Sequence, residues 1–430
     1  AFFPHPAMRF GSQAEGSITH TEIVQLGFIR SLAQYFLDTQ NGSKIKPDDF
    51  RQENTLDGLF QIVHPNWHSE QLKLNTFPLK LAIDTIQVQN ALVDLEAATK
   101  DLPTAHFDAE SFVASNRRVM DLRKKVIEIV KSSKPDFDSA LKKIGELLHT
   151  LQDFYSHSNW VEMGKTDVNA RIGLEENIGR IAEPNQPTCS SNGCQKIKSS
   201  CNILEIMFLK TCPMIYYDCK DNILPEILTQ GILTSGYYAN QYNEKKEPVL
   251  KPTNVAKCSH GSIIDTTAHQ APIGGINKDS TKPEYSPHYY FHLKAVQLAI
   301  EATQRFFNDL RKDIGNPIFE RLFSINPTTT QLGKAAKAIA ENEKFRFFSS
   351  TFSIGLSTGD AEFQQFLKGV LQKILNIFIG IRRPDTPTYD ISDLVNKQPQ
   401  ASKGLRSALI GNDKMTKKKR LGQRRFRWIL

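Results

Sequence analysis

Several motifs that would identify a familiar class of protein are missing from this sequence of 430 residues. It has no run of eighteen apolar residues, so it predicts no transmembrane helix. It has no Gly-x-Ser-x-Gly motif, which leaves a serine-hydrolase elbow unsupported. The glycine-rich stretch at 274–279 lacks the Gly-Lys-Ser/Thr ending of a phosphate-binding loop and predicts a turn. Strand-like alternation is rare, and no internal repeat is present.

Cysteine is scarce, and all six cysteines lie between positions 189 and 258. No two of them have the Cys-x-x-Cys spacing of a zinc knuckle, so that alternative is disfavoured. An even number of clustered cysteines favours disulfides, whose pairing the sequence leaves open. We therefore expect six oxidised residues: Cys189, Cys194, Cys201, Cys212, Cys219 and Cys258.

The start of the sequence lacks both an initiator methionine and a signal peptide, because it reads Ala1-Phe2-Phe3-Pro4. We interpret this as the removal of a leader and expect a secreted, extracellular protein. The sequon that begins at Asn41 lies in a polar stretch, so Asn41 is a candidate glycosylation site in a surface loop.

Apolar residues recur at helical spacing in several segments and predict a mainly α-helical protein. Thr19 is suited to cap the first helix, Pro78 and Pro287 to begin the second and fifth, and Gly315 to end the fifth. The predicted helices span residues 21–37, 78–99, 110–131, 136–157, 287–313 and 363–381.

Two stretches of the sequence look irregular. Residues 182–200 are rich in Pro, Asn, Ser, Gly and Cys, and residues 240–287 form a long excursion that contains Cys258. Loops of this length are usually functional or held by cross-links, so we expect a disulfide-stapled excursion from the helical bundle.

His149, Asp153 and His157 recur every four residues in the fourth predicted helix. Each step of four residues rises about 6 Å, so His149 and Asp153 can bind one ion. His149 and His157 would be about 12 Å apart and cannot share it. The pattern thus indicates at least two ions, or a helix that ends before His157, with Asp153 suited to bridge. The alternative is an amphipathic helix with ordinary histidines, although burying these polar groups without partners is costly.

Further ligand-type residues lie near the ends of other predicted helices. Helix bundles build metal sites in this way, although any one of these residues alone is more often structural. The histidines at 64, 68, 260 and 269 lie in loop-like segments and are interpreted as structural. The candidates near helix ends are His20, Asp94, His106, Asp108, His288 and His292.

The run at 148–162, LHTLQDFYSHSNWVE, resembles the N-terminal region of the family of von Willebrand factor A domain-containing protein 7 and its relatives. It also resembles the fungal Het-C heterokaryon-incompatibility proteins. Shorter matches at 18–20, 106–110, 274–279 and 286–290 follow the family's order, and the resemblance covers residues 1–327. This region in turn is similar to the all-α, zinc-dependent phospholipase C fold, which also hosts single-strand nucleases.

The resemblance implies zinc, up to three ions, and cleavage of phosphodiesters by a metal-activated water. By the family's pattern, His106, His149 and Asp153 are ligands of one ion, and Asp94 is a looser match for a fourth ligand. His20 matches a ligand of a second ion, which Asp153 would bridge to the first. His157 matches a ligand of the third ion. Asp94 would also orient the water, which makes it the candidate catalytic residue. The implied metal ligands are His20, Asp94, His106, His149, Asp153, His157 and His288.

The sequence also departs from the family's pattern. The enzymes use an N-terminal tryptophan amine as a ligand, whereas this chain begins at Ala1 in a segment with no predicted anchor. They also use a His-x-x-x-Glu pair, whereas His288 is followed four residues later by His292. Residues 331–360 contain no Asp-x-Ser-x-Ser motif, so a von Willebrand A domain is absent, truncated or replaced.

Three regions follow from these patterns. A phospholipase C-like, metal-binding helical bundle is predicted at 1–315, a small helical region at 316–396, and a basic, disordered tail at 397–430. Residues 412–430 hold eight Lys and Arg and one acid, and this tail is either simply solvated or a contact for anionic membrane or nucleic acid.

Two functions remain open. The protein is either a secreted zinc-dependent hydrolase of phosphodiesters, in phospholipid or nucleic acid, or a non-catalytic extracellular module with a retained structural metal site. A coordination position left open for water or substrate would favour the hydrolase, since structural zinc sites are usually closed.

Overall fold

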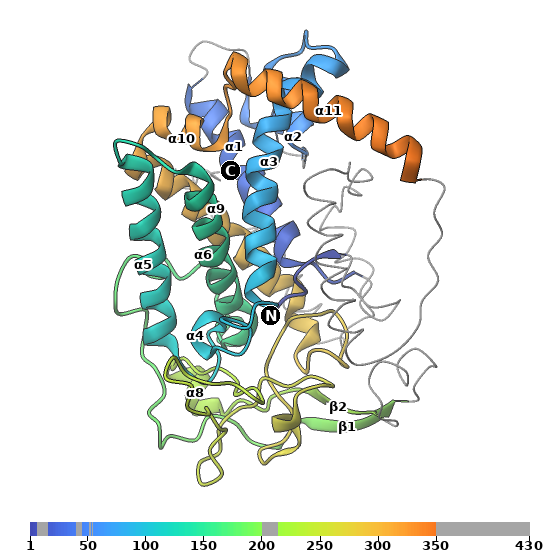
Figure 1. The fold of residues 1–430 in the computed structure, drawn as a ribbon. Helices are drawn as coiled ribbons and strands as arrows, with labels where there is room; N and C mark the ends of the chain where they lie inside the picture. Colours follow the sequence, from blue (N-terminus) through green and yellow to red (C-terminus); the bar gives the residue numbers. More distant parts are fainter. Residues whose placement is uncertain (7–15, 40–44, 51–52, 54, 200–213, 350–430) are drawn as a thin grey trace, which may run out of the picture.

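The computed structural model describes residues 1–6, 16–39, 45–50, 53, 55–199 and 214–349, without the side chains of 340–349. Long helices lie side by side in a bundle, and α11 (Thr329–Ser349) crosses one end of it (Figure 1). The helices of the bundle are α1 (His20–Thr39), α3 (Ser69–Val93), α5 (Phe112–Lys131), α6 (Phe137–His157) and α9 (His292–Ile314). The described chain is therefore mainly α-helical, as predicted.

Shorter elements connect and cover the bundle. None of the helices within the described ranges is long and apolar enough to span a membrane. Strands β1 (Cys194–Ser199) and β2 (Met214–Cys219) pair antiparallel, with Cys194 opposite Cys219. The remaining elements are α2 (Leu56–Val63), α4 (Pro103–His106), α8 (Pro225–Thr229), α10 (Asn316–Phe323) and the 3-10 helices at Pro47–Phe50, Thr266–His269 and Tyr289–Phe291.

Local capping explains where several helices begin and end. The Thr19 N–H donates to Glu22 Oε2 at 2.8 Å before α1, and the Ser139 N–H donates to Asp136 Oδ1 at 3.0 Å at the start of α6. Gly315 ends α9 with a φ of 78°, a conformation that favours glycine. These boundaries confirm the predicted first and fourth helices and the end of the fifth to within a few residues, and α5 matches the third. The predicted start of the fifth helix at Pro287 is wrong, because α9 begins at His292 after the 3-10 helix Tyr289–Phe291.

Helix α3 differs from the prediction, because it begins at Ser69 and contains Pro78 in its interior. Its start is set by His68, whose N–H donates to Gln71 Oε1 at 3.1 Å. Residues buried on both sides of the proline, such as Thr76 and Leu79, continue one packed face through it. Tertiary packing therefore outweighs the cost of an interior proline. The sixth predicted helix, Asn41 and the basic tail lie outside the described residues.

Two glycines allow the helices of the bundle to approach closely. A Cβ atom at Gly145 on α6 would lie 2.5 Å from the Ile86 carbonyl oxygen of α3. A Cβ atom at Gly27 on α1 would lie 2.5 Å from Thr303 on α9. Neither position tolerates a side chain, so α3 packs closely against α6, and α1 against α9. These close contacts lie one to two helical turns from His149 and His20, which belong to the polar groups described below.

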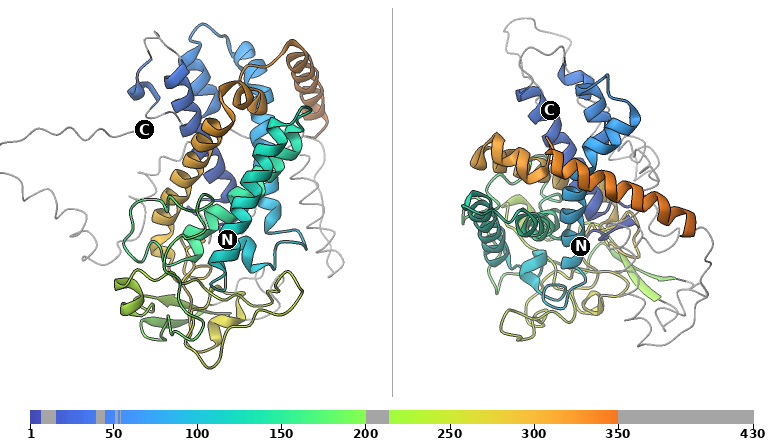
Figure 2. Two further views of the ribbon diagram at one scale, coloured as in Figure 1. Left: turned by 90° about the vertical axis from the view of Figure 1, so that its left-hand side faces the viewer. Right: turned by 45° about the horizontal axis from the view of Figure 1, so that its top comes forward.

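The irregular excursion packs over one end of the bundle, beside α4 and the last turn of α6 (Figures 1 and 2). Two disulfides are present among the described residues, Cys189–Cys258 and Cys194–Cys219. The other two cysteines, at 201 and 212, lie outside the described ranges. The Lys278 N–H donates to the Ser156 carbonyl oxygen, so a backbone bond joins the excursion to the last turn of α6. Just after α6, the Asn159 N–H donates to the Thr234 carbonyl oxygen in the segment that precedes the excursion.

The hydrophobic core fills the space between the long helices. Phe28 of α1 packs against Phe307 of α9 and Phe323 of α10, with ring centroids 5.1 and 4.9 Å apart. Phe319 and Phe323 of α10 thus belong to the same core as the bundle. This apolar core surrounds the bundle axis, while the polar residues gather at the end that the excursion covers.

Candidate metal centre

Histidine and aspartate side chains, buried except for that of the partly exposed Asp94, form three groups that could hold a metal ion. His20 is the first residue of α1, Asp94 follows α3, His106 ends α4, and α6 contributes three residues. The helix ends meet here because the close contacts of α3 with α6 and α1 with α9 bring them together. The groups are His20–His149–Asp153, Asp94–His106–His149 and Asp108–His157–His260.

Four ligand-type atoms converge around His106 and His149. Asp153 Oδ2 lies 2.9 Å from His106 Nδ1 and 3.1 Å from His149 Nε2, and the two nitrogens are 3.1 Å apart. Asp94 Oδ1 lies 3.7 Å from His106 Nδ1 and 3.5 Å from His149 Nε2. Four tetrahedral ligands of zinc, with bonds of about 2.0–2.2 Å, are about 3.3–3.6 Å apart. The atoms of Asp94, His106 and His149 therefore fit one ion, and Asp153 Oδ2 lies against both of its histidine nitrogens.

The two rings of this group differ in protonation. Burial lowers the pKa of His106, but the hydrogen bond and charge of Asp153 outweigh it and hold the pKa above its usual value. The His106 Nε2–H donates to the Thr99 carbonyl oxygen at 3.1 Å, which leaves Nδ1 facing Asp153. Burial lowers the pKa of His149 to about 4, so this ring is neutral near pH 7, as a metal ligand must be. Burial alone would raise the pKa of Asp153, but His149 and His157 hold it well below its usual range. Asp153 is therefore an anion.

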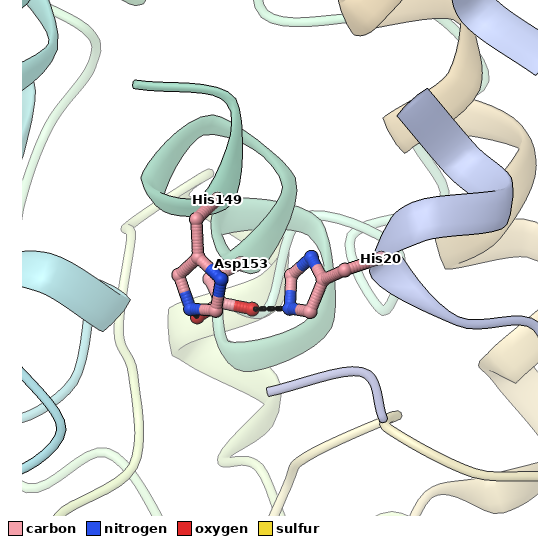
Figure 3. Close-up of side chains that lie close together, drawn as sticks. All are labelled: His20, His149 and Asp153. Atoms are coloured by element: carbon pink, nitrogen blue, oxygen red, sulfur yellow. Dashed lines mark ion pairs between the residues drawn. The ribbon is translucent and has the colours of Figure 1, made fainter. Parts of the chain in front are cut away.

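His20 lies on the other side of Asp153 (Figure 3). Its Nε2 is 3.1 Å from Asp153 Oδ1, and its ring stacks on His149 with centroids 4.1 Å apart. His20 Nε2, Asp153 Oδ1 and Asp94 Oδ2 are buried side-chain atoms without a hydrogen bond. A cation between such atoms would satisfy them. His149 belongs to the first and the second group, and Asp153 contacts histidines of both, His20 through Oδ1 and the pair His106 and His149 through Oδ2.

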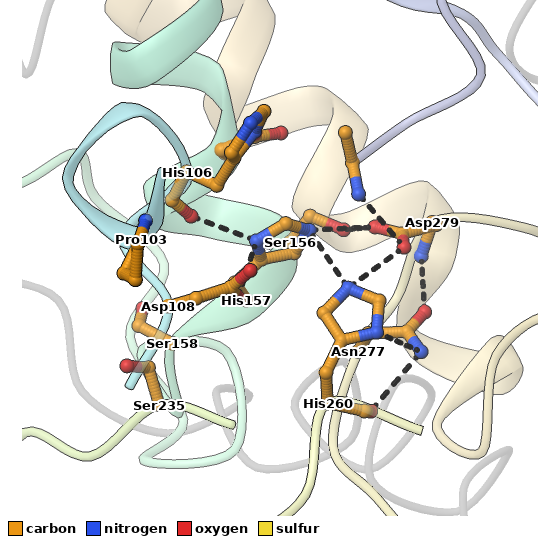
Figure 4. A network of polar contacts seen from close by, with 12 residues as sticks. Pro103, His106, Asp108, Ser156, His157, Ser158, Ser235, His260, Asn277 and Asp279 are labelled. Atoms are coloured by element: carbon orange, nitrogen blue, oxygen red, sulfur yellow. Dashed lines mark hydrogen bonds and ion pairs between the residues drawn. The ribbon is translucent and has the colours of Figure 1, made fainter. Parts of the chain in front are cut away.

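The third group lies one turn further along α6, around His157 (Figure 4). His157 Nε2 and His260 Nε2 are 3.2 Å apart, and Asp279 lies 3.1 Å from the first and 3.2 Å from the second. Asp108 Oδ1 is 3.0 Å from His157 Nδ1. Burial and the Ala1 ammonium lower the pKa of His157, but Asp108 and other carboxylates outweigh both and raise it to about 10. Without a metal ion, a proton therefore occupies this group.

A left-handed loop holds Asp108 in place. Phe107, Ala109 and Glu110 have φ values of 56°, 51° and 56°. The Glu110 carboxylate accepts hydrogen bonds from Lys257 Nζ and Thr234 Oγ1, both at 2.6 Å. These contacts tie the loop to the segment of the excursion that carries His260. They account for backbone conformations that are uncommon outside glycine.

The structure brings together His20, Asp94, His106, His149 and Asp153, all predicted from the sequence. It places the sixth, His157, in a separate group, as the helical spacing requires. Asp153 bridges toward His20 and not toward His157.

Other sequence candidates lie elsewhere. His288 contacts Glu162 Oε1 through Nδ1 and Asn222 Oδ1 through Nε2, both at 2.7 Å, and lies in none of the three groups. His292 is bonded to the backbone at both nitrogens, to the Lys278 carbonyl oxygen and the Ile18 N–H. His64 stacks on Trp67 with centroids 3.9 Å apart, away from the groups.

Sequence reasoning missed His260 and Asp279 as ligand-type residues and did not assign Asp108. The motifs at 106–110 and 274–279 contain both aspartates, so their order along the chain was the available signal. The expectation of an unanchored start is also wrong. Phe2 is fully buried against His20 and His292, and the Ala1 nitrogen lies 3.0 Å from Asp279 Oδ2.

Comparisons with known proteins agree on one family. The family model "VWA7 N-terminal domain" matches residues 68–212 and 207–320. The chain is 30% identical over 335 residues to von Willebrand factor A domain-containing protein 7 of Mus musculus and 30% identical over 334 residues to that of Homo sapiens. Each match covers 77% of this chain but 32% of the relative, so the chain spans about a third of their length. No solved structure matches significantly.

Proposed function

The chain belongs to the family of the VWA7 N-terminal domain, and on that premise we propose that it is an extracellular zinc-binding domain of phospholipase C-like fold that hydrolyses phosphodiesters. One observation carries the proposal. The ligand atoms of Asp94, His106 and His149 are spaced as the ligands of a single ion, Asp153 Oδ2 lies within 3.1 Å of both histidine nitrogens, and each residue comes from a helix or a helix end.

The donor set supports zinc. Imidazole nitrogens suit Zn²⁺, whereas Mg²⁺ and Ca²⁺ take mostly oxygen ligands. Each group contains two histidines and at least one carboxylate, which is the ligand mixture of many zinc sites. The two disulfides support an oxidising, extracellular environment, where such bonds form and persist.

Asp94 is the residue best placed to act on a water molecule. Its side chain is 16% exposed, whereas those of His149 and Asp153 are fully buried. Its Oδ2 makes no hydrogen bond, while Oδ1 faces His106 and His149. A bound zinc ion supplies Lewis acidity and lowers the pKa of a bound water toward neutrality. Asp94 would orient that water through its unpaired oxygen and accept its proton.

The second candidate is a structural metal site without catalysis. It is favoured by the burial of His20, His149 and Asp153, none of which has any exposed side-chain surface. A closed site of this kind would stabilise the fold, because metal bound only to the native state adds to its free energy of unfolding.

Elemental analysis and a hydrolysis assay test the proposal together. We expect at least one zinc ion per purified chain and cleavage of bis(p-nitrophenyl) phosphate, with phosphatidylcholine vesicles and single-stranded DNA as the two physiological substrate classes. Asp94→Asn should lower the rate, whereas Asp57→Asn, which alters a carboxylate paired with Lys80, should not. Zinc content without cleavage of any substrate would support the structural candidate, and protein that takes up no zinc would contradict both.

A further inference from the structure

Two buried carboxamides lie directly behind the first two groups. Asn90 on α3 and Gln152 on α6 are both fully buried, and neither belongs to a ligand group. Burying an amide costs free energy unless its hydrogen bonds are satisfied, so their partners indicate what they do. Each amide oxygen contacts a histidine of the metal centre.

These contacts define the tautomers of two histidines. His20 Nδ1 lies 2.7 Å from Gln152 Oε1, and His149 Nδ1 lies 3.3 Å from Asn90 Oδ1. A carboxamide oxygen can only accept a hydrogen bond, so both Nδ1 atoms carry the proton. The lone pairs are then on Nε2, which in each ring is the nitrogen that faces a different oxygen of Asp153.

The orientation of both amides is set by a chain of donors. Asn90 Nδ2 donates to Gln152 Oε1 at 3.2 Å, and Gln152 Nε2 donates to Thr303 Oγ1 at 3.1 Å. The Thr303 hydroxyl is occupied as a donor, since it bonds the Ala299 carbonyl oxygen at 2.8 Å. Thr303 can therefore only accept from Gln152, and a flipped Gln152 amide would set an oxygen against the Thr303 oxygen. The tautomers of His20 and His149 thus depend on the Thr303 hydroxyl of α9, which fixes the orientation of the Gln152 amide.

We propose that Asn90 and Gln152 are positioning residues, which hold His149 and His20 in the Nδ1–H tautomer so that both Nε2 atoms bind zinc. This inference rests on the proposed zinc binding and names residues that act through the ligands. Hydrogen bonds to the second nitrogen of a ligating histidine orient the ring and raise its basicity. A carboxamide pair supplies that bond here without adding charge beside Asp153.

Variants at the two positions separate this role from simple core filling. Gln152→Met and Asn90→Leu keep much of the volume and remove the acceptor, and each should lower zinc affinity about 10–100-fold. Gln152→Glu and Asn90→Asp keep the acceptor oxygen for the histidine but lose the donor to Thr303 or to Gln152, so they should keep more zinc affinity than the Met and Leu variants and less than the unchanged protein. Asn116→Leu is the matched control, because Asn116 is a buried amide bonded to the backbone of residues 173 and 175 and contacts no ligand.

Zinc affinity is measured on the full chain by competition with a chromophoric chelator, and Co²⁺ substitution reports coordination through its visible spectrum. We expect a changed Co²⁺ spectrum in the Met and Leu variants at 152 and 90, partial recovery in the acidic variants, and no change for Asn116→Leu. Long-range ¹H–¹⁵N spectra of the unchanged protein should show Nδ1–H at His20 and His149.

The outcomes distinguish this inference from the proposed function. If the unchanged chain binds no zinc, both are overturned. If it binds zinc and Gln152→Met and Asn90→Leu bind equally well with the same Co²⁺ spectrum, only the positioning role is overturned. If those two variants fail to fold, the test is the tautomer of His20 and His149 in the ¹H–¹⁵N spectra of the unchanged protein. An Nε2–H tautomer at either ring would reject the inference.

Discussion

His20 and Asp153 meet across the end of the helical bundle, with His20 Nε2 3.1 Å from Asp153 Oδ1 and both side chains fully buried. His20 begins α1 and Asp153 lies within α6, so their contact depends on how α1, α6 and α9 pack. The other oxygen of Asp153 faces His106 and His149. A single carboxylate therefore connects residues from three helices.

Asp153→Asn is expected to lower zinc content most among the carboxylate changes. The amide has nearly the shape of the acid but is a neutral ligand that bridges poorly. The group that contains Asp153 should therefore lose affinity, and so should the neighbouring group, whose His106 and His149 contact the other oxygen of Asp153. In zinc-containing buffer the melting temperature should fall, because bound metal no longer stabilises the native state. Elemental analysis and thermal unfolding measure both effects. An Asp153→Asn variant with full zinc content and full stability would contradict the proposal that Asp153 and its neighbouring histidines bind metal.

The contacts of His260 and His288 predict opposite results when each is changed to glutamine. His260 Nε2 faces His157 and Asp279, so His260→Gln should lower the zinc content of the third group. Both nitrogens of His288 are occupied by Glu162 and Asn222, so His288→Gln should leave zinc content unchanged while lowering stability. The measurement is the zinc content per folded chain of each variant, compared with that of the unchanged protein. Loss of an ion in His288→Gln would restore its assignment as a ligand.

The disulfide Cys189–Cys258 is expected to stabilise the fold more than Cys194–Cys219. The first closes a sequence separation of 69 and the second one of 25, so the loop-entropy estimate is about 4.4 kcal/mol against about 3.5 kcal/mol. Paired Cys→Ala variants and chemical denaturation measure the two losses. Peptide mapping under non-reducing conditions should find both pairings in protein produced in an oxidising compartment, and a different pairing would contradict the structure.

Lys251 should make stability rise with pH in the alkaline range. Its ammonium donates to Ser259 Oγ and to the carbonyl oxygens of Gln270 and Pro272, and burial lowers its pKa from 10.5 to about 8. Between these values the unfolded chain binds more protons than the native one, so the free energy of unfolding increases by up to about 1.4 kcal/mol per pH unit. Below pH 8 both states are protonated and the slope disappears.

Lys251→Met isolates this effect, because other alkaline titrations, such as those of tyrosine, remain in both proteins. The difference in unfolding free energy between the two, measured by denaturant from pH 7 to 10, should grow in favour of the unchanged protein. A difference that is constant over this range would show that the Lys251 pKa is not lowered.

Local patterns in the sequence predicted much of the helical framework. Asp136 caps α6 and Gly315 ends α9 because a capping oxygen and a left-handed backbone act within one turn of chain. The limit of local reasoning is visible at Pro78, which is a good first residue of a helix. The packing of α3 against α6 and α1 extends the helix nine residues before it, and this contact is not encoded in the local sequence.

The sequence by itself determined which face of α6 carries His149, Asp153 and His157, and that His149 and His157 cannot share an ion, because both follow from the helical rise. Only the tertiary structure decided their partners. His260 and Asp279 come from an excursion without regular periodicity, held by a disulfide and by the backbone bond from Lys278 to Ser156 of α6. Asn90 and Gln152 look like ordinary polar helix residues until close helix packing buries them against the rings of His149 and His20. Hydrogen bonds between distant segments depend on sub-ångström placement, which residue spacing does not specify.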